Sequence, residues 1–254
     1  MAQAKVSLEK NRSKRAALLS SITLALFACT AQLVGPTAAD SLNRFERTYS
    51  PRDTPRLTIS NVNGNIRVSA WERKIVSVRA NSAPSVTISD QMIGDDITIT
   101  VKKDFRLGRS DFEVSVPADA SLSLKNFMGD IEVRGATGHV SINSIDSNVR
   151  LIGVNSPTID VKVTTGDIFM DGELHEGGSY SLQSMKGDID VTVPDSTPFN
   201  LNARALSENI NLGSFLSRFS GATKGPKGIS GSHLNGGPRL TLTTYAGHIL
   251  LHKR

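Results

Sequence analysis

The stretch that decides the fold is Ser121–Val133, with the sequence SLSLKNFMGDIEV. Leu122 and Leu124 alternate with polar residues, a Gly-Asp pair makes a tight turn, and Ile131 and Val133 alternate again. Because successive side chains of a strand point to opposite faces, this pattern predicts two short strands, each with one apolar face.

The same strand–turn–strand pattern returns along the chain, with turns at Ser147-Asn148, Gly166-Asp167 and Gly187-Asp188. The apolar residues after the turns lie 18, 19, 21 and 21 residues apart and are Ile131, Val149, Ile168, Ile189 and Ile210. A period of about 20 residues built on two-residue alternation is typical of stacked β units. Glycine suits turns with positive φ, and an Asp or Asn beside it can accept backbone hydrogen bonds.

One unit offers about four aliphatic side chains to a core, and burying them contributes roughly 1.5–3 kcal/mol each. Ordering about 20 residues costs roughly 1–2 kcal/mol per residue in backbone entropy, so a single unit cannot fold. Stacking lets neighbouring units share a core and hydrogen bonds. The sequence therefore predicts an all-β chain, a two-sheeted or three-sided β-solenoid of about 20-residue units, with a stacked β-sandwich as the alternative.

The chain divides into three segments by composition. Residues 1–39 have the layout of a secretory signal peptide, with a basic start, the apolar run Ala16–Ala28 and small residues up to Ala39. Residues 40–56 are interpreted as a polar linker and residues 57–251 as the β-repeat domain. Within this domain, residues 213–238 are rich in Gly and Ser and are predicted to form a flexible loop with partial strand character near Phe215 and Phe219.

The single cysteine, Cys29, lies in the sequence LFAC, which resembles a bacterial lipobox. Either Cys29 is an apolar residue of a removed signal peptide, or its lipidation anchors the chain to a membrane. In both cases we expect an exported protein, located in the periplasm, at the outer membrane or on the cell surface.

The net charge of +5 belongs mostly to the N-terminal segment. Residues 1–39 hold five basic residues and one acid, so the remainder carries 24 basic and 23 acidic residues. A chain so nearly balanced in charge does not support nucleic-acid binding.

Motifs for a nucleophile elbow, a P-loop or a dinucleotide site are absent from the sequence. The histidines show no metal-ligand spacing and are expected at the surface or in turns; they are His139, His175, His233, His248 and His252. We therefore predict no catalytic, cofactor-binding or metal-binding residues and no cofactor.

Asp130, Asp167 and Asp188 share one position in their units, so we expect them to stack along one edge, about 4.8 Å apart from unit to unit. They could accept hydrogen bonds within their turns, share a Ca²⁺ ion, or act as an acid/base pair on a polysaccharide. Asn148 and Asn209 at equivalent turns favour the first interpretation, because an amide oxygen also accepts hydrogen bonds but is a poorer metal ligand.

Two further groups could contact ligands. Trp71 and Tyr245 could stack on sugars or meet a partner, or they could cover exposed core at an end of the solenoid. The cations of the predicted loop could meet anionic glycans or lipid head groups, or could simply be solvated; they are Arg218, Lys224 and Lys227.

Two groups of residues carry a family resemblance. The first is Leu57–Val68 with Trp71 and Val76–Val78, and the second is Gly236–Pro238 with Leu240–Leu242 and Gly247–Ile249. From about Leu57 to Leu251 the chain resembles the bacterial putative adhesin family, a family of exported β-repeat domains of unknown function. The resemblance implies a stacked-β fold and a cell-envelope location, and it attaches no catalytic residue to the chain.

A regular repeat without a catalytic constellation predicts a non-catalytic envelope protein, which presents a β surface for interaction or scaffolding. Its partner would be an envelope component, a glycan or a protein, and we expect membrane attachment only if Cys29 is lipidated. Two alternatives remain. One is a polysaccharide lyase or hydrolase with an acidic stripe, and the other is a structural element that assembles through open sheet edges.

Overall fold

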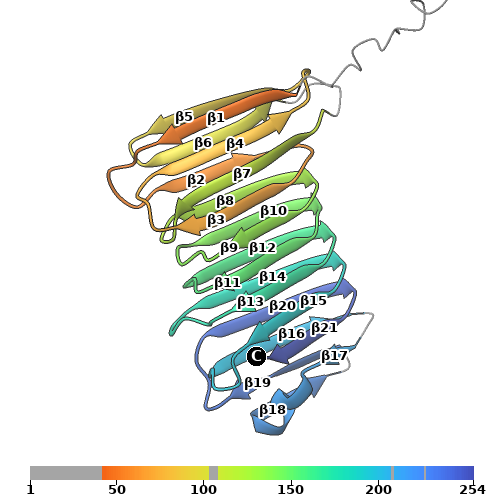
Figure 1. The fold of residues 1–254 in the computed structure, drawn as a ribbon. Coiled ribbons are helices and arrows are strands. Elements are labelled where there is room, and N and C mark those ends of the chain that lie inside the picture. Colours follow the sequence, from red (N-terminus) through yellow and green to blue (C-terminus); the bar gives the residue numbers. More distant parts are fainter. Residues whose placement is uncertain (1–41, 103–107, 207–208, 226) are drawn as a thin grey trace, which may run out of the picture. The chain divides into compact units, whose positions relative to one another are not determined.

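The computed structural model describes residues 42–102, 108–206, 209–225 and 227–254. The predicted signal peptide and Cys29 lie outside these residues and stay predictions. The described part forms two long β-sheets packed face to face, with strands stacked like rungs (Figure 1). The all-β class and the stacked repeat are confirmed, with two sheets rather than three sides.

The first sheet has ten strands. Their spatial order is β1 (Asn43–Tyr49), β4 (Val76–Ser82), β7 (Ser110–Pro117), β3 (Ile66–Trp71), β9 (Ile131–Arg134), β11 (Val149–Val154), β13 (Ile168–Gly172), β15 (Ile189–Val193), β21 (Ile249–Lys253) and β17 (Ile210–Asn211).

The second sheet has eleven strands. Their spatial order is β18 (Phe219–Gly225), β19 (Gly228–His233), β16 (Phe199–Ala205), β20 (Arg239–Ala246), β14 (Ser179–Lys186), β12 (Thr158–Thr165), β10 (Val140–Asp146), β8 (Ser121–Met128), β2 (Arg56–Ser60), β6 (Asp96–Lys102) and β5 (Thr87–Ile93). The 3₁₀-helix η1 (Gly213–Arg218) lies between β17 and β18 in the chain. None of the helical structure in the described ranges is long and apolar enough to cross a membrane.

Each rung consists of one strand of the eleven-stranded sheet, a tight turn and one strand of the ten-stranded sheet. The rungs β8–β9, β10–β11, β12–β13 and β14–β15 follow one another, and equivalent strands pair in parallel and in register. Equivalent inner positions therefore form apolar rows between the sheets. One such row contains Leu57, Leu122, Val140, Ile159, Tyr180, Leu240 and Leu201, and a row of the other sheet includes Ile66, Ile131, Val149, Ile168 and Ile189.

The order of the rungs in space differs from their order in the chain at both ends. The rung β20–β21 lies between β14–β15 and β16–β17, so Ile249, and not Ile210, pairs with Ile189. At the other end β6–β7 lies outside β2–β3, which pairs with β8–β9. All these units present similar aliphatic rows, so the repeat specifies that units stack without specifying which unit comes next.

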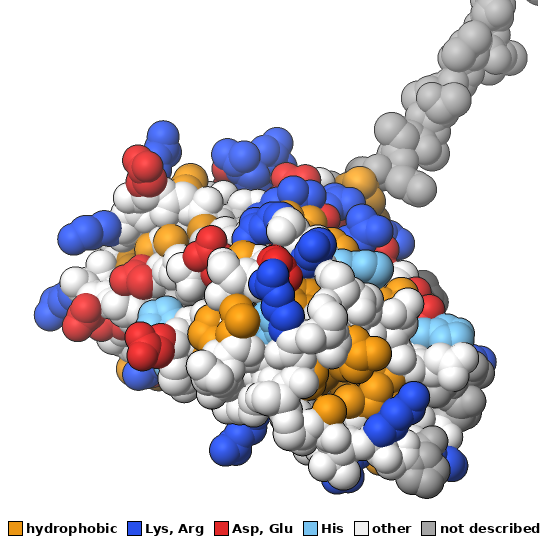
Figure 2. Space-filling view, turned by 90° about the horizontal axis from the view of Figure 1, so that it is seen from below, with side chains coloured by type: hydrophobic (Ala, Val, Ile, Leu, Met, Phe, Trp, Pro, Cys, Tyr) orange, Lys and Arg blue, Asp and Glu red, His pale blue; other side chains and the backbone are white. Residues whose placement is uncertain are grey.

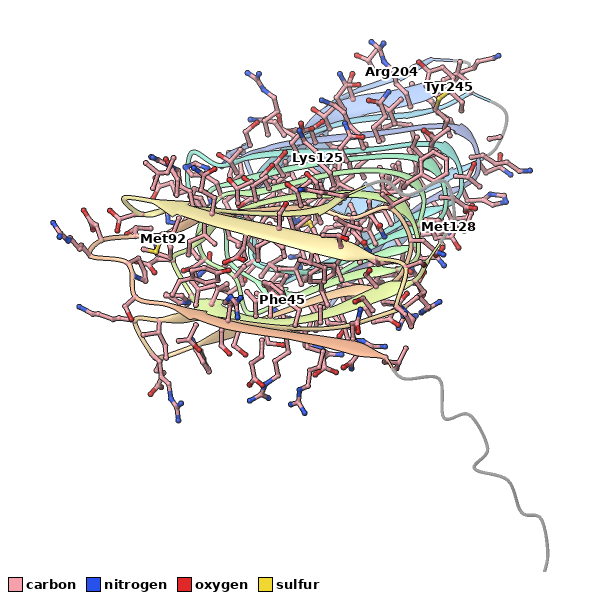
Figure 3. The ribbon with its side chains drawn as sticks, turned by 90° about the horizontal axis from the view of Figure 1, so that it is seen from above. Phe45, Met92, Lys125, Met128, Arg204 and Tyr245 are labelled. Atoms are coloured by element: carbon pink, nitrogen blue, oxygen red, sulfur yellow. The ribbon has the colours of Figure 1, made fainter. Side chains whose placement is uncertain are left out.

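Polar side chains close the N-terminal end of the core. Arg47 on β1 and Asp90 on β5 lie 3.7 Å apart (Nε to Oδ2), and the Tyr49 hydroxyl donates a hydrogen bond of 2.8 Å to the same carboxylate. Figure 3 looks onto this end, where β1 and β5 are the outermost strands and Phe45 and Met92 are labelled. Charges that point inward from edge strands disfavour pairing with another chain.

Two boundary predictions are wrong. The predicted linker over residues 40–56 contains β1, which pairs with β4 along its whole length. The predicted flexible loop over residues 213–238 contains η1, β18 and β19, and β19 pairs with β16. Its glycines and serines join the sheet through their backbones, which composition alone does not reveal.

An aromatic cluster explains why the segment over residues 213–238 is ordered into these elements. Phe199, Phe215, Phe219 and His233 pack with ring centroids 5.0 to 6.1 Å apart. Phe215 and His233 are fully buried, so this cluster covers the C-terminal end of the core. Figure 2 views the molecule from this end and shows hydrophobic side chains between interspersed positive and negative ones.

The tight turns inside the rungs leave no room for a side chain. Gly166 and Gly187 have φ values of +132° and +149°. A Cβ atom on Gly187 would lie 2.1 Å from the carbonyl oxygen of Gly166, and one on Gly166 would lie 2.1 Å from that of Ser147. On the inner side, the hydroxyls of Ser184 and Thr244 donate to the carbonyls of Gly166 and Gly187 at 3.0 and 2.9 Å.

We predict that Gly187→Ala lowers the free energy of unfolding by at least about 2 kcal/mol, because positive φ costs an L-residue ~1–3 kcal/mol and the carbonyl clash adds to it. Gly177→Ala is the matched control, since Gly177 has a φ of +70° and open space around its missing Cβ. Urea unfolding followed by circular dichroism measures both variants. An equal loss of stability in the two would contradict the close approach of the turns.

Candidate functional site

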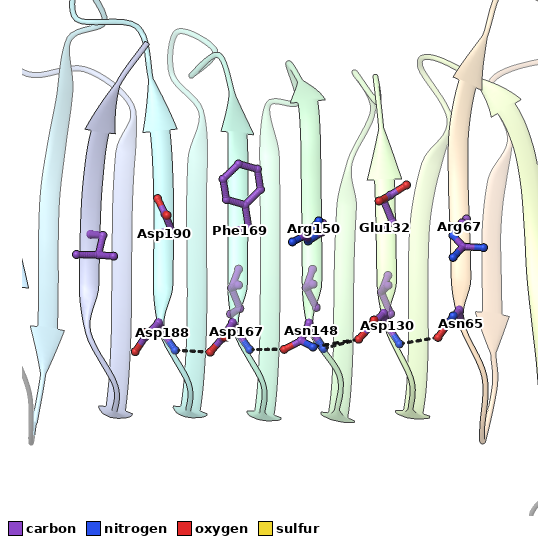
Figure 4. Close-up of a pocket in the computed structure, with 14 residues that line it drawn as sticks. Asn65, Arg67, Asp130, Glu132, Asn148, Arg150, Asp167, Phe169, Asp188 and Asp190 are labelled. Carbon is purple, nitrogen blue, oxygen red and sulfur yellow. Dashed lines mark hydrogen bonds between the residues drawn. The ribbon is translucent and has the colours of Figure 1, made fainter.

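A groove of about 550 Å³ runs along the outer face of the ten-stranded sheet, beside the turns. Two rows of outward-facing side chains line it (Figure 4). The row next to the turns consists of Asn65, Asp130, Asn148, Asp167 and Asp188. The second row lies two residues further along each strand and consists of Arg67, Glu132, Arg150, Phe169, Asp190 and Leu250.

The row next to the turns is a continuous series of hydrogen bonds, which we name the Asx ladder. In each step, an Oδ1 atom accepts a hydrogen bond from the backbone N–H of the equivalent residue in the next rung. The steps run from Asp111 to Asn65 (2.8 Å), to Asp130 (3.0 Å), to Asn148 (3.3 Å), to Asp167 (3.0 Å), to Asp188 (2.8 Å) and to His248 (2.7 Å).

The predicted role of Asp130, Asp167 and Asp188 as hydrogen-bond acceptors is confirmed, but the donor lies in the neighbouring rung and not in the same turn. Asn148 occupies one place in the ladder, so the position needs an oxygen acceptor and not a charge. The rung of Asn209 lies beyond that of His248, so Asn209 does not follow Asp188 in the stack.

The Asx ladder offers little to a metal ion. Asn148 separates Asp130 from Asp167, so only Asp167 and Asp188 are carboxylates in adjacent rungs. Within the residues that the structure describes, no three His, Cys, Asp or Glu side chains are arranged to hold a metal. The Ca²⁺ interpretation therefore gains no support.

The second row alternates in charge over six strands. Residues that face one another across the sheet are, in order, Glu46, Arg79, Glu113, Arg67, Glu132 and Arg150. Opposite charges in such positions stabilise a sheet by roughly 0.2–1 kcal/mol per pair. Arg134 donates a 2.7 Å hydrogen bond to Glu132 and thereby lowers the pKa of this carboxyl, and Arg67 and Arg150 act in the same direction.

The alternation stops at Phe169, which follows Arg150 in the row and is followed by Asp190. Asp190 lies opposite Phe169 on β13 and Leu250 on β21. Burial raises the pKa of Asp190, while His252, whose Nε2 lies 3.5 Å from Oδ1, opposes this shift. The Oδ1 atom is buried and accepts no hydrogen bond from any described residue. The groove thus offers alternating charges at one end, and an aromatic ring beside a desolvated carboxyl at the other.

Comparison with known protein families matches residues 48–252 to Toastrack DUF4097. The chain belongs to the Toastrack DUF4097 family. The resemblance to a family of β-repeat domains of unknown function, inferred from the sequence, is thereby confirmed. None of the curated proteins matches this Toastrack chain.

Two solved structures similar to this Toastrack chain come from bacteria. One is described as a putative cell adhesion protein from Clostridium sporogenes; it is 11% identical, with a TM-score of 0.49, and the match covers 84% of this chain and 100% of that one. The other is described as a putative adhesin from Bacteroides fragilis; it is 10% identical, with a TM-score of 0.40, and the match covers 85% of this chain and 99% of that one.

The five histidines of the Toastrack chain do not form one site. His233 is buried in the aromatic cluster, with Nε2 3.1 Å from the carbonyl oxygen of Asp195. His248 ends the Asx ladder and His252 lies beside Asp190, whereas His139 and His175 are exposed elsewhere.

The other candidate residues are also dispersed. Trp71 lies on β3, inside the sheet and not at an end of the stack, and its Nε1 donates to the carbonyl of Ile75 at 2.9 Å. Tyr245 is exposed on β20. Arg218 is 3.3 Å from Asp195, and Lys224 and Lys227 are exposed at the C-terminal end.

The sequence prediction missed the second row of the groove. Glu132 and Asp190 each stand two residues after a ladder residue, separated from it by one buried isoleucine. This short alternation, Asp-Ile-Glu and Asp-Ile-Asp, places both acids on one outer face and is the signal that could have identified them.

We predict that Asp167→Asn changes the free energy of unfolding by less than about 0.5 kcal/mol, because its amide oxygen still accepts the N–H of Asp188. Asp167→Ala should cost ~0.5–1.5 kcal/mol, the net contribution of one hydrogen bond. Asp160→Ala is the control, because Asp160 forms an exposed ion pair with Lys162, and such pairs contribute ~0–1 kcal/mol.

Thermal unfolding with and without Ca²⁺ measures these three variants. A Ca²⁺-dependent rise in the melting temperature of the wild type, which Asp167→Asn loses, would show that the ladder carboxylates bind metal and would contradict a role limited to hydrogen bonding.

Proposed function

We propose that this Toastrack chain is an exported, non-catalytic protein of the cell envelope that binds an extended polysaccharide along the groove of its ten-stranded sheet. The observation that carries the proposal is the repetition of the lining, since each rung from β2–β3 to β14–β15 contributes one Asp or Asn next to the turn and one outward-facing side chain two residues further on. With rungs about 4.8 Å apart, six strands span ~24 Å, the length of several sugar units. A polymer of repeating units would meet a carboxylate or amide group of the row next to the turns in each of these rungs.

The chemistry of the lining suits sugar hydroxyls. Carboxylates accept hydrogen bonds and guanidinium groups donate them, so the alternating second row offers both. The ladder steps use only the Oδ1 atoms of Asp130, Asp167 and Asp188, which leaves each Oδ2 atom outside the ladder. Phe169 adds a flat apolar ring at one end of the groove.

Binding without turnover is supported by the positions of the carboxylates. Glycoside hydrolysis needs an acid with a raised pKa and a second carboxylate on the opposite side of the scissile bond. Asp190 has the raised pKa, but the neighbouring row of carboxylates is held in the Asx ladder. We infer that these groups hold the strands together and leave Asp190 without a catalytic partner.

The closed ends of the stack disfavour the alternative of self-assembly. Arg47 and Asp90 occupy the edge strands at the N-terminal end. At the other end the edge strand β18 carries a bulge between Ser220 and Thr223. Inward charges and bulges are both devices that prevent edge strands from pairing.

Export is supported by the composition of residues 1–39, whose basic start and apolar run have the layout of a signal peptide. The family resemblance inferred from the sequence also implies a location in the cell envelope.

The proposal is tested by retention on immobilised neutral, acidic and amino polysaccharides, with release of reducing ends measured in the same samples. The wild type should be retained on at least one polymer and should release no reducing ends. Phe169→Ala and Arg150→Ala should each weaken retention about tenfold, a loss of ~1.4 kcal/mol. Phe127→Ala, on the outer face of the other sheet, is the control and should bind as the wild type does.

Failure of the wild type to bind any polymer would overturn the proposal. Release of reducing ends that Asp190→Asn abolishes would instead establish a hydrolase or lyase.

A further inference from the structure

Large hydrophobic side chains form a row on the outer face of the eleven-stranded sheet. Phe127, Ile145, Met185 and Tyr245 stand at equivalent positions of β8, β10, β14 and β20, with Thr164 of β12 between them. Their exposed fractions are 46, 45, 52 and 44%. We name this set the corner row, because it lies just before the turns. Single exposed apolar residues are ordinary, but the corner row gathers two adjacent pairs on one face, and exposed apolar groups clustered in this way indicate an interaction surface.

A row of polar side chains, three of which are cations, runs alongside the corner row. It lies two residues earlier in each strand and contains Lys125, Asn143, Lys162, Gln183, Thr243 and Arg204. The two rows are therefore about 7 Å apart. Figure 3 shows Lys125, Arg204 and Tyr245 on the side of the molecule away from β1.

The six strands that carry these two rows contain two acidic residues, Asp146 on β10 and Asp160 on the central strand β12. Asp160 is held by Lys162 at 3.0 Å, and Asp146 stands at a turn next to the corner row. The polar row itself contains three cations and no acid, so it is complementary to an anionic surface.

The size and chemistry of the corner row indicate which kind of partner it can bind. A stable protein interface buries roughly 1,200–2,000 Å² of surface. Four half-exposed side chains offer only roughly a few hundred Å² of apolar surface. A second copy packed on this face would also bring its cations near those of the first. Ile145 and Met185 offer no flat ring to a sugar, but they enter lipid readily.

We propose that this face binds the surface of an anionic lipid bilayer. The corner row inserts between the head groups and the acyl chains, and Lys125, Lys162 and Arg204 lie against lipid phosphates. The separation of the two rows matches the depth of ~5–10 Å over which interfacial segments reach from head groups to acyl chains. Basic residues beside such a segment strengthen its attachment to anionic lipid.

This contact departs from the sequence-based expectation that a membrane is reached only through lipidated Cys29. It uses the sheet opposite the groove, so the groove stays open while the other face lies on lipid. The proposal does not depend on polysaccharide binding, and either one can fail alone.

The test is co-sedimentation with vesicles of phosphatidylcholine, with and without phosphatidylglycerol. The full chain and its compact unit, residues 41–254, are measured in parallel, so that attachment through the first 40 residues is separated from attachment through the face. The unit contains the whole described core, which begins at Tyr49. We expect it to sediment with the anionic vesicles, to remain soluble with the neutral ones, and to be released by salt.

Two combined variants and one control locate the contact. Exchanging the four corner-row residues for Ser (F127S, I145S, M185S and Y245S) should lower the bound fraction roughly tenfold, as should K125Q, K162Q and R204Q together. Phe169→Ser with Ile152→Ser, on the outer face of the ten-stranded sheet, should leave binding unchanged. Circular dichroism melts establish that each variant is folded.

The proposal is overturned if residues 41–254 do not sediment with anionic vesicles, even where the full chain does. It is equally overturned if neutral vesicles bind as well as anionic ones, or if the folded corner-row variant binds like the wild type.

Discussion

The structure depends on the close approach of consecutive turns. The N–H of Gly166 donates to the carbonyl of Lys186 at 2.8 Å, and that of Gly187 donates to Ala246 at 2.9 Å, so each turn is bonded to the next. At a rung spacing of about 4.8 Å this leaves no space for a Cβ atom. On the inner side of these turns, the hydroxyl groups of Ser184 and Thr244 donate hydrogen bonds to turn carbonyls. On the outer side, the hydrogen bonds of the Asx ladder join one turn to the next. The turns therefore fix the register of both sheets.

Because the register is fixed, equivalent residues of the repeated sequence line up as rows of similar side chains. On the ten-stranded sheet the rows carry amide, carboxylate and guanidinium groups, and they line a groove suited to a polar polymer. On the eleven-stranded sheet they carry apolar groups beside cations. The two faces thus have different chemistry, although the same turns position both. A protein that lies on lipid with one face and holds a glycan with the other would keep that glycan close to the membrane.

The strand–turn–strand unit could be predicted from sequence because it is local: alternation marks the strands, and glycine beside Asp or Asn marks the turn. The ladder position was also readable, because Asn148 replaces Asp there. The order of the rungs in space cannot be predicted from the sequence. Ile249 and Ile210 would present the same side chain to Ile189, and only the structure shows that Ile249 pairs with it. The order of the segment around Phe215 cannot be predicted from its composition, because its strands pair through backbone bonds of a stretch rich in Gly and Ser, and the burial of Phe215 depends on Phe199.

Native-state hydrogen exchange, resolved by residue, tests the central claim that the turns form a continuous bonded edge. The amides of Asp167 and Asp188 donate to ladder oxygens at 3.0 and 2.8 Å. They should therefore exchange as slowly as the strand amides of Ile168 and Ile189, which open only when the stack does. Gly177, in an exposed turn, provides the fast reference. If Asp167 and Asp188 exchange as fast as Gly177, the turns are not bonded to one another and the account is wrong.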